Sequence, residues 1–222
     1  MTNQQAKETE IRLPDPEELS SSMAVIAERS QRLVADFLAK QAEDPEISDP
    51  DPLNIGSAFV ELTSHMMKNP AKLVEAQMDL WQQYYLLWHN TTMRMMGQDS
   101  DPVALPQKGD RRFRDEAWED NELFGFIKQS YLLSSQWMQN VVQDVDGLDE
   151  KTAQKVEFYT RQFADAISPT NFMMTNPEVL RATIESGGEN LLKGLQNLLS
   201  DLERGKGKLQ IRMTDLDAFK IG

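Results

Sequence analysis

Apolar residues near the start of this chain recur at steps of three, four and seven positions, which is the spacing of one face of an α-helix. The first such stripe falls within residues 16–42, and its members are Leu19, Met23, Ile26, Leu33 and Phe37. We therefore expect a helical arm over residues 16–42. The polar residues 1–15 before it are typical of a disordered segment.

Three prolines interrupt the pattern after the arm. Residues 43–52 hold Pro45, Pro50 and Pro52 among acidic residues. Proline lacks the amide donor of a helix and disfavours the helical conformation in the residue before it. This stretch is therefore predicted to be a proline-rich acidic linker.

Helical spacing returns after the linker and continues to about residue 205. It predicts helices over about residues 55–66, 70–97, 115–144, 149–167, 177–186 and 189–204. Pro70 suits the first position of a helix, where a missing N–H costs nothing. Gly147 and the pair Gly187–Gly188 are predicted to end helices, because glycine adopts the left-handed conformation that helix termini often need. The fold class is therefore predicted to be all-α, with an irregular multi-helix domain over residues 53–205.

The pattern changes again at the end of the chain. Residues 209–213, Leu-Gln-Ile-Arg-Met, alternate apolar and polar side chains, which is the signature of a strand. A single strand cannot satisfy its own backbone hydrogen-bonding groups. Residues 206–222 are therefore a short strand-like tail that either begins a sheet-bearing domain or is disordered.

Composition excludes several classes of function. The net charge is −13 over 222 residues, and no cluster of Lys and Arg dominates, which argues against nucleic-acid binding. The absence of cysteine removes disulfides, thiolate metal ligands and thiol catalysis. The first residues lack the pattern of a signal peptide, and no stretch has the roughly 18 apolar residues of a membrane span. We expect a cytoplasmic protein.

Motifs for catalysis or cofactor binding are not found in the sequence. Its glycines fit neither a phosphate loop nor a dinucleotide fingerprint, and there is no Gly-x-Ser-x-Gly elbow. Glu61 and His65 share a predicted helix face, but a di-metal site needs Glu-x-x-His on two helices. We expect no catalytic residue, no cofactor and no metal ion, and a helical carboxylate metal protein is kept as an alternative.

Large apolar side chains mark the predicted helix at 70–97, which carries Trp81, Trp88 and Met95. Methionine packs adaptably and is common at promiscuous interfaces. A stripe at helical spacing is, however, normally part of a core. A docking surface and an ordinary core both stay open for these residues.

Several short stretches together resemble one protein family. They are Gly109-Asp110-Arg111-Arg112-Phe113, Gln129-Ser130-Tyr131-Leu132-Leu133, Ser168-Pro169-Thr170-Asn171-Phe172, Asn176-Pro177 and Gly187-Gly188. In this order they resemble the N-terminal region of class I polyhydroxyalkanoate synthases, over about residues 53–222. The resemblance implies structural or interaction roles for Arg111, Arg112, Phe113, Ser168, Pro169, Asn171, Phe172, Asn176, Pro177, Gly187 and Gly188.

Two adjacent arginines within the first stretch have two interpretations. Arg111 and Arg112 could clamp a carboxylate or a phosphate, such as a phosphate of CoA. They could instead form ion pairs with the acidic residues of this chain.

The resemblance implies that this chain alone is inactive. Synthases of this family polymerise hydroxyacyl-CoA thioesters into a storage polyester, and their nucleophile is a cysteine in a following α/β-hydrolase domain. This sequence has no cysteine. Residues 215–222 resemble the stretch that leads into the catalytic domain, so residues 206–222 are predicted to begin it. The whole protein would be an acyltransferase.

The resemblance also implies that this region makes contacts. In the family it is associated with dimerisation, granule localisation, binding of phasin-type and activator proteins, and support of the catalytic domain. The candidate partner or granule surface consists of Leu19, Met23, Ile26, Leu33, Phe37, Trp81, Trp88 and Met95. The arm could bind a second subunit, a granule protein or the polymer, or fold back onto the main domain. A stand-alone phasin-like granule adaptor is the alternative function.

Overall fold

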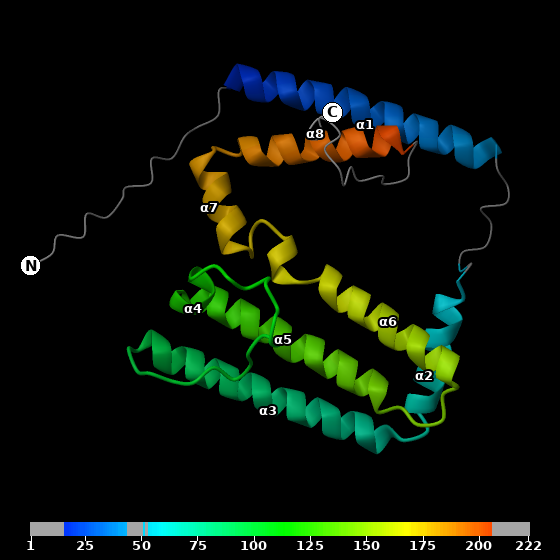
Figure 1. Cartoon of the computed structure of the whole chain (residues 1–222), viewed down its shortest axis with the longest axis vertical. Helices are drawn as coiled ribbons and strands as arrows, with labels where there is room; N and C mark the ends of the chain where they lie inside the picture. Colours follow the sequence, from blue (N-terminus) through cyan, green and yellow to red (C-terminus); the bar gives the residue numbers. More distant parts are fainter. Residues whose placement is uncertain (1–15, 44–50, 52, 206–222) are drawn as a thin grey trace, which may run out of the picture. The chain divides into compact units, whose positions relative to one another are not determined.

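The computed structural model describes residues 16–43, 51 and 53–205. All regular secondary-structure elements within these residues are helices, joined by turns and loops (Figure 1). Eight α-helices and one short 3-10 helix form in this described part. The all-α prediction is confirmed. The expected disordered start, nearly all of the proline-rich linker and the strand-like tail lie outside the described residues.

The described helices belong to two compact units. The first, which we call the central unit, covers residues 51–180, and the second, the terminal unit, combines parts of residues 1–50 and 181–222. Helix α7 (Pro177–Glu185) contains the point of division, after Leu180.

The central unit is built around α5 (Glu122–Gln143), which packs against α3 (Pro70–Met95) on one side and α6 (Glu150–Ala166) on another. Helix α2 (Ile55–Met66) packs on α6, and the short α4 (Ala117–Asp120) packs on α5. Figure 1 shows α3, α5 and α6 running side by side, with α3 at the edge of this unit.

Two clusters of buried side chains form the core of the central unit. Ala58 and Leu62 of α2 meet Val156 of α6 in the first. In the second, Phe113 and Tyr131 surround Trp118 of α4, whose side chain is almost wholly buried. Burying an aromatic ring of the size of Trp118 removes on the order of 150–250 Å² from water, so the second cluster strongly stabilises the packing of α4 on α5.

One predicted boundary is wrong. We expected a single helix over about 115–144, but the structure breaks it into α4 and α5 at Asn121, whose backbone is extended. The Oδ1 atom of Asn121 accepts hydrogen bonds from the amides of Leu123 and Phe124 at 3.0 and 3.2 Å. This is an N-cap, which satisfies amides that have no partner inside a helix.

The terminal unit consists mainly of α1 (Pro16–Glu43) and α8 (Glu189–Arg204), which pack against each other. Ile26 of α1 and Leu199 of α8 are buried. Arg29 donates to both carboxylate oxygens of Glu203 at 2.8 and 2.6 Å and to Ser200 Oγ at 3.0 Å. The predicted arm helix is confirmed, and the sequence had not indicated that α8 would lie against it.

Candidate functional site

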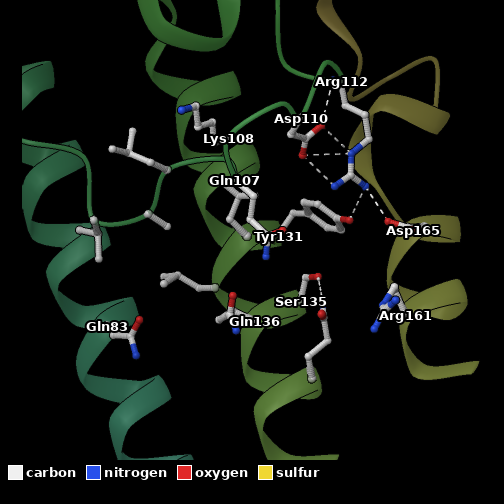
Figure 2. A pocket seen from close by; sticks show the side chains of 16 residues that line it. Gln83, Gln107, Lys108, Asp110, Arg112, Tyr131, Ser135, Gln136, Arg161 and Asp165 are labelled. Carbon is white, nitrogen blue, oxygen red and sulfur yellow. Dashed lines mark hydrogen bonds and ion pairs between the residues drawn. The ribbon is translucent and has the colours of Figure 1, made fainter. Parts of the chain in front are cut away.

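The side chain of Arg112 joins three segments of the central unit that are distant in sequence. Its Nε and Nη2 atoms donate to the Asp110 carboxylate in the preceding loop at 3.0 and 2.8 Å. Its Nη1 atom donates to the hydroxyl of Tyr131 on α5 at 2.8 Å and to Asp165 on α6 at 2.9 Å (Figure 2). We call Asp110, Arg112, Tyr131 and Asp165 the Arg112 cluster.

Aromatic rings surround the same guanidinium. Its central carbon lies 5.4 Å from the ring centroid of Tyr131 and 5.7 Å from that of Phe113. A cation over an aromatic face is attracted by the ring quadrupole. Phe113 in turn meets Trp118 edge to face at 5.1 Å between centroids, so Arg112 is also tied to the second core cluster.

The charged forms of Arg112 and Asp110 stabilise each other. Hydrogen bonding to Asp110 is the largest cause that raises the pKa of the Arg112 guanidinium. The same hydrogen bond lowers the pKa of the Asp110 carboxyl, against the opposing effect of burial. Because both shifts favour the charged forms, neither group exchanges a proton near neutral pH. The cluster is therefore suited to a structural role.

A polar pocket of about 690 Å³ opens beside the Arg112 cluster (Figure 2). Lys108 from the loop and Arg161 from α6 line it, and their side chains form no hydrogen bond or ion pair with another described residue. Ser135 on its α5 side accepts a hydrogen bond from Gln139 at 3.2 Å. Neither histidine nor cysteine is among the lining residues.

The two adjacent arginines differ in the structure. Arg112 forms ion pairs inside the chain with Asp110 and Asp165, as the second interpretation of the pair predicts. Arg111 is exposed and has no hydrogen bond or ion pair to another described residue. A role for Arg111 in binding an anion therefore stays a prediction.

The turn between α6 and α7 is held by amide side chains. Asn171 Nδ2 donates to the carbonyls of Asp165 and Ala166 at 2.8 and 3.0 Å, where the last carbonyls of α6 have no helical partner. Asn176 Nδ2 donates to the Thr170 carbonyl at 2.8 Å, and its Oδ1 accepts from the amides of Glu178 and Val179. Each asparagine therefore connects the turn to a helix end.

The remaining motif residues lie at the same connections. Ser168, Pro169 and Pro177 are buried, whereas Phe172 is exposed. Gly187 and Gly188 have φ values of +60° and +91° and separate α7 from α8. These positions need the left-handed conformation, so they support the predicted helix ends.

The exposed face of α3 is the second candidate site. Leu73, Leu80, Tyr84 and Leu87 lie on the more buried side, and the Tyr84 hydroxyl bonds to the Ser130 carbonyl and to Ser134 Oγ of α5. On another face, large side chains remain exposed. The set Val74, Met78, Trp81, Tyr85, Trp88, Thr92 and Met95, which we call the α3 seam, is exposed except for the half-buried Thr92.

The structure therefore places Trp81, Trp88 and Met95 on the surface of this chain. Val74, Met78 and Tyr85 were not among the residues predicted from the sequence to form this surface. The signal was present, since these residues continue the same alternation of three and four positions. When a helix is apolar on most of its circumference, the sequence pattern alone does not distinguish a second, exposed stripe from the buried one.

The predicted surface of the arm is only partly open. Met23 is exposed, Leu33 is half-buried and Ile26 is buried in the terminal unit. The side chains of Leu19 and Phe37 lie outside the described residues. A contact role for the arm stays a prediction.

Metal-binding clusters and membrane-spanning helices are both absent from the described part of the chain. It contains no group of three or more His, Cys, Asp or Glu side chains that could hold a metal ion. Each of its helices is too short or too polar to cross a bilayer.

Comparisons with known proteins agree on one family. Residues 109–222 match the family model described as the poly-beta-hydroxybutyrate polymerase (PhaC) N-terminus. The chain is 38% identical over 210 residues to the poly(3-hydroxyalkanoate) polymerase subunit PhaC of Rhizobium meliloti, covering 94% of this chain and 34% of that protein. It is 47% identical over 156 residues to the poly(3-hydroxyalkanoate) polymerase of Methylorubrum extorquens, covering 70% and 26%.

A third relative is the poly(3-hydroxyalkanoate) polymerase subunit PhaC of Cupriavidus necator, 38% identical over 151 residues, which cover 68% of this chain and 25% of that protein. The chain therefore spans about a third or less of the length of these relatives. The comparison with solved structures found no match.

Proposed function

This chain belongs to the poly-beta-hydroxybutyrate polymerase N-terminus family, and we propose that it serves such a polymerase by making contacts rather than by doing chemistry. The contacts are with a second subunit, with the polyester granule, with phasin-type and activator proteins, and with the catalytic domain of the same protein. The whole protein would be an acyltransferase that makes polyester from hydroxyacyl-CoA, located in the cytoplasm on the granules.

The observation that carries this proposal is the α3 seam. Trp81 and Trp88 are 69% and 60% exposed, and Met95 is 67% exposed. Soluble monomers seldom leave a contiguous apolar patch larger than a few hundred Å² open to water, and larger patches mark interaction sites. Trp, Tyr and Met are also the residue types enriched at protein interfaces. The seam therefore supports a contact role for this region.

The Arg112 cluster also supports a role in making contacts rather than in chemistry. It ties two stretches of family resemblance, residues 109–113 and 129–133, to the end of α6, and its charged groups are already satisfied by each other. The chain has no cysteine and so cannot supply a thiol nucleophile. The cluster stabilises the fold of the central unit, which carries the α3 seam on its surface.

The arm gives a second surface for partners. One side of α1 packs against α8, while Met23, Val25 and Val34 remain about half exposed. A helix pair with apolar residues left on its outside is a suitable site for another amphipathic helix. We assign contacts with granule proteins to this surface.

Localisation in living cells tests the proposal. The whole protein that carries this chain is fused to a fluorescent protein in cells that store polyester. We expect the fusion on granules, and we expect Trp81→Gln/Trp88→Gln to lower the granule-bound fraction several-fold. Phe158→Gln on α6 is the matched control, because Phe158 is also an exposed aromatic residue, 52% exposed. An unchanged granule-bound fraction in the double variant would contradict the proposal.

A further inference from the structure

The polar pocket beside the Arg112 cluster carries positive charge. Its charged lining residues are Lys108, Arg112 and Arg161, against the carboxylates of Asp110 and Asp165. The whole chain carries −13, so a pocket in which cations outnumber carboxylates differs from the rest of the molecule. A cleft lined by one sign of charge raises the local concentration of ions of the opposite sign. The pocket therefore favours an anionic occupant.

Two of these cations are not neutralised within the described part of the chain. Asp110 accepts from Arg112 through both carboxylate oxygens, and Asp165 accepts from Arg112 at 2.9 Å. The side chains of Lys108 and Arg161 form no hydrogen bond or ion pair with another described residue. Asp165 lies one turn after Arg161, but an exposed ion pair at this spacing contributes little. Both charges therefore remain available to a ligand.

Two glutamine side chains add neutral donors to the pocket. Gln107 precedes Lys108 in the loop, and Gln83 lines the pocket from α3 (Figure 2). Neither amide group has a hydrogen-bond partner among the described residues. Each amide supplies two N–H donors. A loop and two helices thus provide donors around one cavity, which suits a ligand with several acceptor oxygens.

The Arg112 cluster fixes the loop relative to α6. Lys108 stands two residues before Asp110, and Arg161 stands one turn before Asp165. Arg112 forms ion pairs with both of these carboxylates, at 2.8 and 2.9 Å. The backbone that carries the two free cations is therefore held in place before a ligand binds, and preorganisation of this kind lowers the entropic cost of binding.

The size and the walls of the pocket suit an organic ligand. Its volume of about 690 Å³ lies within the range of roughly 300–1,000 Å³ that is typical of small-molecule sites. Residues 103–105, Val-Ala-Leu, add an apolar stretch of the loop to the lining, and Leu105 is 67% exposed. A simple inorganic ion would leave most of this space and its apolar wall unused.

We propose that this pocket binds a phosphorylated organic molecule, whose phosphate groups are held by Lys108 and Arg161. A guanidinium group matches two phosphate oxygens at once, and an ammonium group adds a point charge. A phosphate monoester carries about −1.5 to −2 charges at neutral pH, which two free cations balance. Gln83 and Gln107 donate to the remaining oxygens, and residues 103–105 contact the organic part.

Calorimetric titration of the full 222-residue chain with CoA at low ionic strength tests this site. CoA carries a monoester phosphate and a diphosphate on one organic molecule, and its choice rests on the proposed function, in which the whole protein uses hydroxyacyl-CoA. We expect CoA to bind and pantetheine, which lacks the phosphates, not to bind. Inorganic pyrophosphate should bind more weakly than CoA, because it cannot contact residues 103–105. Absence of CoA binding, or binding of pantetheine or pyrophosphate as tight as that of CoA, would overturn the proposal.

Two double variants locate the binding. Lys108→Gln/Arg161→Gln should weaken CoA binding about tenfold or more, because hydrogen bonds to charged groups are lost. The matched control is Arg114→Gln/Lys151→Gln, which removes the same charge from two exposed residues outside the pocket lining. We expect a change within about twofold for the control, since exposed charges at a distance are screened. Equal weakening by the two double variants would overturn the assignment of the site.

Granule binding of the same variants separates this inference from the proposed function. Neither Trp81 nor Trp88 lines the pocket, so Lys108→Gln/Arg161→Gln should keep the granule-bound fraction of the natural chain. A chain that binds granules through these tryptophans but does not bind CoA would overturn the pocket assignment alone. The proposed function would then stand.

Discussion

Arg112 donates a hydrogen bond to Asp165 at 2.9 Å, although the two residues are 53 positions apart in sequence. The contact joins the loop before α4 to the last turn of α6, and the same guanidinium binds Asp110 and the Tyr131 hydroxyl. Five N–H donors in a planar fork allow one arginine to hold several acceptors at once. Arg112 is therefore the side chain on which three segments of the central unit depend.

Replacing Arg112 with lysine should destabilise the chain. Lysine keeps the charge but cannot reach all three partners with one ammonium group. We expect a loss of about 1–2 kcal/mol in the free energy of unfolding, because hydrogen bonds to charged groups are worth more than neutral ones but the side chain is partly exposed to solvent. Urea unfolding at pH 7 measures it. Arg111→Lys is the control, with an expected change under about 0.5 kcal/mol, and equal losses in the two variants would contradict the account.

The stabilisation from Asp110 should depend on pH. Arg112 lowers the pKa of Asp110 in the folded chain below the unfolded value of about 3.9. The carboxylate therefore contributes its stability fully above about pH 4, and this contribution is lost as the pH falls through the lower folded pKa. Asp110→Asn should be less stable than the natural chain at pH 7, and the difference should shrink below about pH 4. Unfolding free energies over pH 2–7 check this, and a constant difference would be inconsistent with it.

Replacing Glu119 should destabilise the chain more than replacing Lys128, although the two residues form one ion pair. The Lys128 side chain is only 1% exposed, whereas that of Glu119 is 59% exposed, and they are joined at 2.5 Å. Glu119→Gln leaves a buried ammonium without its counter-charge, so we expect a loss of about 1–3 kcal/mol. Lys128→Met removes the buried charge and keeps the volume, so we expect a change within about 1 kcal/mol of zero. Thermal or urea unfolding of both variants measures the two losses of stability. A larger loss for Lys128→Met than for Glu119→Gln would refute the prediction.

Removing the side chain of Asn176 should weaken the start of α7. Its Oδ1 accepts from the amides of Glu178 and Val179, and its Nδ2 donates to the Thr170 carbonyl. Loss of an N-cap costs about 0.5–2 kcal/mol, so Asn176→Ala should fall at the upper end of that range. Asn176→Asp should cost less, because it keeps the cap and loses only the donor. Urea unfolding ranks the two against Asn197→Ala, an exposed asparagine within α8, and no loss for Asn176→Ala would contradict the cap.

Local features of this fold could be predicted from the sequence. The apolar stripe and the prolines located α1, the start of α3 at Pro70 and the start of α7 at Pro177, because these depend on a few neighbouring residues. Asn121 was missed for a related reason. Its cap interrupts an apolar pattern that continues across the break, and periodicity alone cannot reveal a one-residue interruption.

Contacts between distant segments could not be predicted. Nothing in the sequence near Arg112 indicates that Asp165 would reach it, and the packing of α8 on α1 joins residues about 170 positions apart, as in the pair Arg29–Glu203. The side of α3 that faces α5 was also undetermined. Leu80 and Trp81 are adjacent apolar residues, and only the packed structure shows that the first is half-buried and the second exposed.

Co-sedimentation with isolated polyester granules tests the central claim most directly. The purified 222-residue chain is mixed with granules and hydroxybutyryl-CoA, and the bound protein and the released CoA are measured in the same samples. We predict that the chain sediments with the granules, that Trp81→Gln/Trp88→Gln reduces the bound fraction several-fold relative to Phe158→Gln, and that no CoA is released by the chain. Release of CoA, or equal binding by the two variants, would contradict a contact role carried by the α3 seam.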